Sequence, residues 1–160
     1  MVLLVGSGLL VRSLGALAAV DKGFESDGVL MARVAPPQGT FDGRDDWLAF
    51  YDGVLADLDA SPDVEAAATT LLVPLSGNSW ERRVRSEAGP EETEEQPSFL
   101  FNVVSEAYFE ALGIPVVRGR VFEAGDTEGA PPVTVVDETL AERFWPGQDP
   151  IGRQVSFEGN

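Results

Sequence analysis

The first twenty residues constrain this chain most, because they are almost entirely apolar and they lead into an acidic remainder. Residues 1–20 read MVLLVGSGLLVRSLGALAAV, and Arg12 is the only charged side chain among them. A membrane-spanning helix needs about 20 apolar residues, so this segment is marginal as a complete span. It fits better as the outer end of a span whose beginning is missing, with Arg12 reaching the membrane interface. We therefore expect a transmembrane-type helix or stalk over residues 1–20.

Two other interpretations of this segment stay open on the sequence alone. Ala16, Ala18 and Ala19 resemble the small-residue cleavage site of a secretory signal peptide, although no basic region precedes the apolar run. The segment could also be a buried core helix. The first two interpretations both place the following domain outside the cytoplasm.

The acidic composition limits the partners of the remaining chain. It has 160 residues, 44% of them hydrophobic, which is enough for one domain with a core or for two small lobes. Its formal charge is −16, from 27 acidic and 11 basic residues. Such a charge repels phosphate backbones, so we expect no nucleic-acid partner.

The sequence offers no chemistry that would suggest an enzyme. Cys and His are both absent, which removes thiolate sites, Ser-His-Asp triads and the commonest metal ligand. Asp45 and Asp46 are adjacent, so on a helix they would point roughly 100° apart. The run at 91–95 lacks the glycine and the alternating oxygen ligands of a calcium loop. Gly6-Ser7-Gly8 lacks the third glycine of a dinucleotide fingerprint, so we predict no catalytic, cofactor-binding or metal-binding residues.

Periodicity predicts a strand–helix–strand unit in the first half of the acidic region. Residues 28–34 alternate like a strand, and residues 64–73 form a second β-leaning run. Between them, residues 44–60 carry apolar side chains at helical spacing, with Asp42 or Asp45 as the candidate N-cap. The sequence therefore predicts an α+β fold that contains a split βαβ unit.

The second half alternates between short strands and short helices. Ser105 and Asp137 are the candidate N-caps of the two helices, and Asp126 is a candidate cap in the turn at 123–129. We expect strands over residues 80–86, 98–104, 132–136 and 154–157, and helices over residues 106–112 and 138–144. The last strand opens as the sequence stops, so we expect the closing C-terminal part of the fold to be missing.

A few side chains have both a structural and a functional interpretation. Trp47 could anchor a partner on the surface of the amphipathic helix. Arg82, Arg83 and Arg85 form a local basic patch that could pair internally or contact an anion or a protein. Four aromatic residues are best explained as core anchors, and four glycines as residues of positive-φ turns; these are Tyr108, Phe109, Phe144 and Trp145, and Gly113, Gly119, Gly147 and Gly152.

Several segments together resemble a known family. They include LLVGSGLLVRSL at 3–14, PLSG at 74–77, VVSEAYFEALGIPVVRGRVF at 103–122 and PPVTVVDETLAERFWPGQDPIGRQV at 131–155. This combination resembles the extracytoplasmic (periplasmic) core domain of MacB-type ABC transporter permeases, especially the acidobacterial-type duplicated permeases. The resemblance covers nearly the whole chain.

The resemblance implies an architecture. It divides the chain into the end of a transmembrane helix or stalk (1–20), half of a porter-like βαβ lobe (21–73), an inserted second α/β lobe (74–137) and a truncated return segment (138–160).

The resemblance also implies a non-catalytic role in an inner-membrane transporter. A separate cytoplasmic ATPase subunit or domain would hydrolyse ATP, and this domain would convert that work into movement in the periplasm, for export or mechanotransmission. The implied partners are other permease segments or a second permease copy, the ATPase, the membrane and a periplasmic protein. Two alternatives remain: a tethered or secreted ligand- or protein-binding module without an ATPase, and a hydrolase built on acidic residues.

Overall fold

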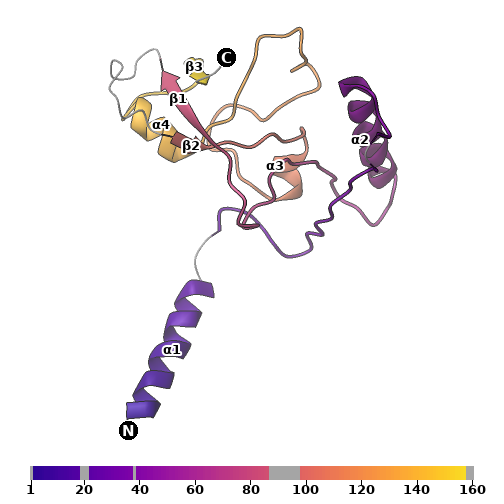
Figure 1. The fold of residues 1–160 in the computed structure, drawn as a ribbon. Helices are drawn as coiled ribbons and strands as arrows, with labels where there is room; N and C mark the ends of the chain where they lie inside the picture. Colours follow the sequence, from indigo (N-terminus) through magenta and orange to yellow (C-terminus); the bar gives the residue numbers. More distant parts are fainter. Residues whose placement is uncertain (1, 19–21, 38, 87–97, 158–160) are drawn as a thin grey trace.

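The computed structural model describes residues 2–18, 22–37, 39–86 and 98–157, which form a mixed α+β structure (Figure 1). The helices are α1 (Val2–Ala18), α2 (Arg44–Asp59), α3 (Tyr108–Ala111) and α4 (Glu138–Phe144). The strands are β1 (Glu81–Ser86), β2 (Ser98–Leu100) and β3 (Val155–Phe157). The predicted acidic loop with Glu91, Glu92, Glu94 and Glu95 lies outside the described residues.

The three strands form one antiparallel sheet in the order β2-β1-β3. Val84 of β1 pairs with Phe157 of β3, and Arg82 pairs with Phe99 of β2. Because side chains alternate along a strand, Arg82 and Val84 share one face of the sheet. That face carries the core. Its cluster consists of buried Val84, Leu140, Phe144 and Trp145, with Phe99, Val136, Val155 and Phe157 packed around them.

Helix α4 supplies most of this core, and local sequence signals fix its position. Oδ1 of Asp137 accepts a hydrogen bond from the backbone N–H of Leu140 at 2.7 Å, which confirms the predicted N-cap. Gly147 follows the helix with φ +66°, as expected for a residue that lets the chain turn back. Leu140, Phe144 and Trp145 therefore face the sheet, and the strand prediction for 154–157 is confirmed by β3.

A second contact region joins residues 69–72 to residues 102–105. Thr70 and Val104 form an isolated antiparallel bridge, and Nδ2 of Asn102 donates to the Leu72 carbonyl at 2.9 Å. Oγ of Ser105 accepts from the Thr69 N–H, so Ser105 ties these segments together instead of capping α3, whose N-cap is Ala107. The strand predicted at 64–73 is therefore wrong, since only Thr70 forms a bridge there. The predicted strand at 98–104 is reduced to β2, and the predicted helix at 106–112 shrinks to α3.

The strands predicted over 28–34 and 132–136 are wrong. Neither segment belongs to the sheet that the described residues form, and Leu30 is 92% exposed. Strand composition alone does not supply a partner, and neither segment pairs with a strand of the described chain, although Val136 packs on the core cluster. Helix α2 forms as predicted, but without the two flanking strands of a βαβ unit. Its N-cap is Gly43 and has no side-chain hydrogen bond, so the predicted caps Asp42 and Asp45 are wrong.

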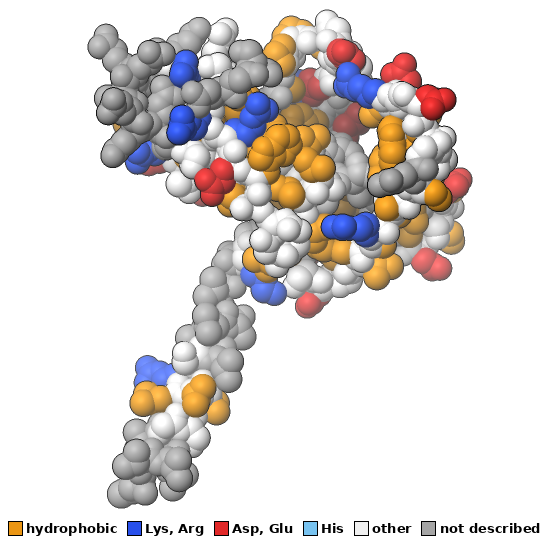
Figure 2. All heavy atoms as spheres, in the orientation of Figure 1, with side chains coloured by type: hydrophobic (Ala, Val, Ile, Leu, Met, Phe, Trp, Pro, Cys, Tyr) orange, Lys and Arg blue, Asp and Glu red, His pale blue; other side chains and the backbone are white. Residues whose placement is uncertain are grey.

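Helix α1 stands apart from the other elements (Figure 1), and its described apolar side chains are exposed (Figure 2). Leu9, Leu10 and Val11 are each more than 60% exposed. Within the described residues, no helix reaches the length and apolar character that crossing a membrane requires. The four-range division of the chain stays a prediction; α4 and β3 of its last range pack against β1 of its third.

Candidate functional site

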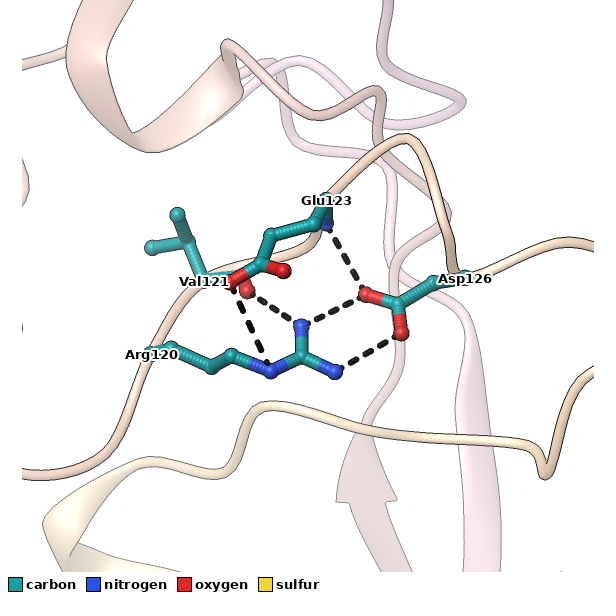
Figure 3. Close-up of polar contacts among 4 residues, drawn as sticks. All are labelled: Arg120, Val121, Glu123 and Asp126. Carbon is teal, nitrogen blue, oxygen red and sulfur yellow. Dashed lines mark hydrogen bonds and ion pairs between the residues drawn. The ribbon is translucent and has the colours of Figure 1, made fainter.

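The best-defined polar arrangement of the described chain surrounds Arg120 (Figure 3). Nη1 and Nη2 of Arg120 donate to Oδ2 and Oδ1 of Asp126 at 2.7 and 2.8 Å, a two-pronged ion pair. Nη1 also donates to the Val121 carbonyl at 2.9 Å, and the backbone N–H of Glu123 donates to Oδ2 of Asp126 at 2.9 Å. We call Arg120, Val121, Glu123 and Asp126 the Arg120 clamp, because together they close the turn at 120–126.

Both charges of the clamp are stabilised in their ionised forms. The hydrogen bond from Arg120 and then the bond from the Glu123 N–H lower the pKa of Asp126 from 3.8 to about 2. The same ion pair raises the pKa of Arg120 above its usual value. The Asp126 side chain is only 14% exposed, whereas Arg120 is 48% exposed. The clamp therefore stays charged over the whole physiological pH range.

The two residues just before the clamp lie against the turn that follows α4. Gly119 has φ +79°, and a Cβ built on it would lie 2.9 Å from Cδ1 of Ile151. Arg118 lies beside Asp149, with Nη1 3.8 Å from Oδ1. The predicted positive φ is confirmed at Gly119, as it is at Gly113, Gly147 and Gly152.

Just after the clamp, the chain contacts the start of α2. Glu128 follows the clamp closely in the chain, and its Oε2 lies 2.9 Å from Nη1 of Arg44, the first residue of α2. This ion pair joins residues that are 84 positions apart. The segment from 118 to 128 thus bridges α2 and the turn after α4.

Helix α2 carries an aromatic cluster, which we define as Phe41, Trp47, Phe50 and Tyr51. The Phe41 and Trp47 rings meet edge-on at 5.0 Å, and Trp47 stacks on Tyr51 at 6.1 Å. The Tyr51 hydroxyl donates to the Val34 carbonyl at 3.3 Å. Trp47 remains 37% exposed, and its predicted role as an anchor for a partner stays a prediction.

The basic patch of the sequence divides between the two faces of the sheet. The Arg82 guanidinium lies over the rings of Trp80, Phe101 and Phe157, 5.6 to 5.8 Å from their centres. Of the two interpretations of the basic patch, internal pairing therefore describes Arg82. Arg83 and Arg85 alternate with it and are exposed on the opposite face.

The predicted aromatic core anchors fall into two groups. Phe144 and Trp145 are buried, and none of the described residues accepts a hydrogen bond from the buried Nε1 of Trp145. Tyr108 and Phe109 are half-buried, and their rings meet at 5.6 Å. Burial raises the pKa of Tyr108, against the opposing effect of its hydrogen bonds with Asn102 and Thr70.

The described residues bring no candidate metal ligands together. No group of three or more acidic side chains in the described part of the chain is placed to hold a metal ion. In the Arg120 clamp the carboxylates are paired with a guanidinium, so the clamp stabilises the turn and offers no free ligand to a metal ion.

Sequence reasoning missed the clamp. The sequence suggests Asp126 only as a cap in the turn at 123–129, and it gives Arg120 no role of its own. The available signal was the turn sequence Glu123-Ala-Gly125 between them, which can fold the chain back so that residues six apart meet.

Comparison with known proteins now adds to this geometry. A family model described as "MacB-like periplasmic core domain" matches residues 4–160. The chain belongs to this family. It is the family of the periplasmic, non-catalytic core domain of ABC transporter permeases. The resemblance found in the sequence is thereby confirmed at this level.

Individual relatives are distant. The "Macrolide export ATP-binding/permease protein MacB" of Neisseria gonorrhoeae (strain ATCC 700825 / FA 1090) is 30% identical over 54 residues, and so is the protein of the same name from Neisseria meningitidis serogroup B (strain ATCC BAA-335 / MC58). The matched segment is 34% of this chain and only 8% of each relative. No solved structure matches the chain.

Proposed function

We propose that this chain is a non-catalytic extracytoplasmic domain of an ABC transporter permease. It would couple ATP hydrolysis in a separate cytoplasmic subunit or domain to movement outside the membrane, for export or mechanotransmission. The single observation that carries the proposal is the family match over residues 4–160. The absence of Cys and His from the sequence, which leaves few catalytic groups, agrees with it.

In this proposal α1 is the outer end of a membrane anchor in the inner membrane, and the acidic remainder lies in the periplasm. The exposed apolar side chains of α1 support this placement, since lipid would cover them. Arg12 would lie at the membrane interface. The proposed partners are other permease segments or a second permease copy, the ATPase and a periplasmic protein.

The proposed division of labour follows the four ranges 1–20, 21–73, 74–137 and 138–160. In this proposal, movement of the membrane anchor reaches the rest of the domain through contacts that remain intact while the domain moves. The core cluster and the Arg120 clamp are contacts of that kind, because one is buried and the other is a two-pronged ion pair.

Membrane fractionation of cells that express the full chain tests the anchor. We expect the protein in the membrane fraction, and we expect Leu9→Lys with Leu10→Lys to shift it to the soluble fraction, because each charge is costly in lipid. Leu100→Lys is the matched control, since Leu100 is exposed on the domain and not on α1. A wild-type protein found entirely in the soluble fraction, or ATP turnover by the purified chain alone, would contradict the proposal.

A further inference from the structure

Helix α2 makes few hydrogen bonds and ion pairs with the rest of the described chain. None of its residues is buried, and α2 is not among the element pairs that pack extensively against one another. Its ring contacts are made with Phe41 or within the helix, and its Tyr51 hydrogen bond reaches Val34. The contacts that leave the helix therefore use the segment that leads into α2. Among the hydrogen bonds and ion pairs of the described residues, the one that ties α2 to a distant part of the sequence is the pair of Arg44 and Glu128.

The site that receives Arg44 is fixed in place. Glu128 lies in a turn in which the Ala130 N–H donates to the Thr127 carbonyl at 2.9 Å. The Arg120 clamp ends two residues earlier, at Asp126. Gly119, just before the clamp, lies close to Ile151 in the turn after α4. Glu128 is therefore carried by a segment that contacts the turn after α4.

The two ion pairs along this path differ in strength. The side chains of Arg44 and Glu128 are 68% and 82% exposed, and they meet through a single pair of atoms. Exposed pairs of this kind are weak and are screened by salt. The clamp is two-pronged, and its Asp126 is mostly shielded from solvent. The connection from α2 to the 118–128 segment is therefore a weak ion pair, Arg44 with Glu128. The segment itself is held by a stronger ion pair, Arg120 with Asp126.

We propose that the pair of Arg44 and Glu128 is an ionic latch that fixes α2 against the 118–128 segment and releases it when the pair is broken. High ionic strength or a competing charged partner opens the latch, and the clamp keeps the receiving segment in place. The latch itself is a property of this chain. Its use in transport rests on the proposed function.

Distances between two spin labels on the full 160-residue chain test the latch. The chain contains no cysteine, so Ala56→Cys on α2 and Glu142→Cys on α4 introduce the only two labelling sites, and both positions are exposed. We expect a narrow distance distribution at low ionic strength. We expect it to broaden in about 1 M salt, where the Debye length falls to about 3 Å.

Charge reversal separates the latch from general electrostatic effects. Arg44→Glu and Glu128→Arg should each broaden the distribution at low salt, and the double variant should restore the narrow one. Arg33→Glu makes the same change of charge outside the pair and should leave the distribution narrow. Circular dichroism of each variant checks that α2 is still helical.

The proposal is overturned if the single reversals leave the distances unchanged, or if the double variant stays as broad as the singles. It is also overturned if Arg33→Glu broadens the distribution as much as Arg44→Glu does. None of these outcomes depends on membrane attachment. A soluble protein with a working latch would refute the proposed function alone, and an anchored protein without salt or charge dependence would refute the latch alone.

Discussion

Replacement of Gly119 by alanine tests whether the left-handed turn beside the Arg120 clamp is required. Gly119 has φ +79°, a region that costs an L-residue about 1–2 kcal/mol. The added Cβ would also lie 2.9 Å from Cδ1 of Ile151, but that atom ends a flexible side chain that is 56% exposed, so it can move aside. We therefore expect Gly119→Ala to lower the free energy of unfolding by about 1–2 kcal/mol, mostly through backbone strain.

Two other glycines serve as matched comparisons for this experiment. Gly147 has φ +66° and open space around its Cβ position, so Gly147→Ala carries the strain without any contact and should cost about as much. Gly125 has neither a positive φ nor a close neighbour, so Gly125→Ala should be neutral or stabilising by up to about 1 kcal/mol. The free energies come from urea unfolding followed by circular dichroism and tryptophan fluorescence.

The combination Gly119→Ala with Ile151→Ala separates the two causes. If strain dominates, removing the Ile151 side chain recovers little of the lost stability. The reasoning is refuted if Gly119→Ala proves as harmless as Gly125→Ala, or if Ile151→Ala restores most of the loss, because the contact and not the backbone would then be responsible.

Three further substitutions probe the core, the helix cap and the clamp. Phe144→Ala should lower the free energy of unfolding by about 3–5 kcal/mol, because Phe144 is buried in the core cluster, while Leu100→Ala, at a position 75% exposed, should change it by less than about 0.5 kcal/mol in urea unfolding. Asp137→Ala should cost about 1 kcal/mol by the same measurement, through loss of the hydrogen bond to Leu140, with no change in any activity. Since the folded-state pKa of Asp126 is depressed to about 2 from 3.8, its stabilising contribution is present above pH 3.8 and is lost as the pH falls toward 2; acid titration of Asp126→Asn should therefore show a shallower loss of stability between these pH values than wild type, and equal slopes would contradict this.

Sequence reasoning succeeded where the signals were local. The helix at 138–144 has a capping aspartate at its start and a Pro-Gly pair after its end, so its limits could be predicted almost to the residue. The strand at 81–86 and the short strand at 155–157 were also predictable, because side chains of alternating character mark them. The resemblance to the MacB-like family relied on such segments.

It failed where a partner far along the chain decides the structure. Residues 28–34 and 132–136 have strand composition, but composition does not name the strand that must pair with them. The Arg120 clamp and the pair of Arg44 and Glu128 depend on how the turns at 118–130 are folded, and no pattern of period two or 3.6 reports that geometry. Serine is a residue type that favours N-caps, but the hydroxyl oxygen of Ser105 instead accepts a hydrogen bond from the N–H of Thr69, 36 residues away.

Labelling of the Ala56→Cys variant with a membrane-impermeant thiol reagent tests the central claim most directly. The chain has no other cysteine, and Ala56 is exposed on α2. If the domain lies outside the cytoplasmic membrane, intact spheroplasts should be labelled as completely as lysed ones. Labelling that requires lysis would place the domain in the cytoplasm and would contradict the account.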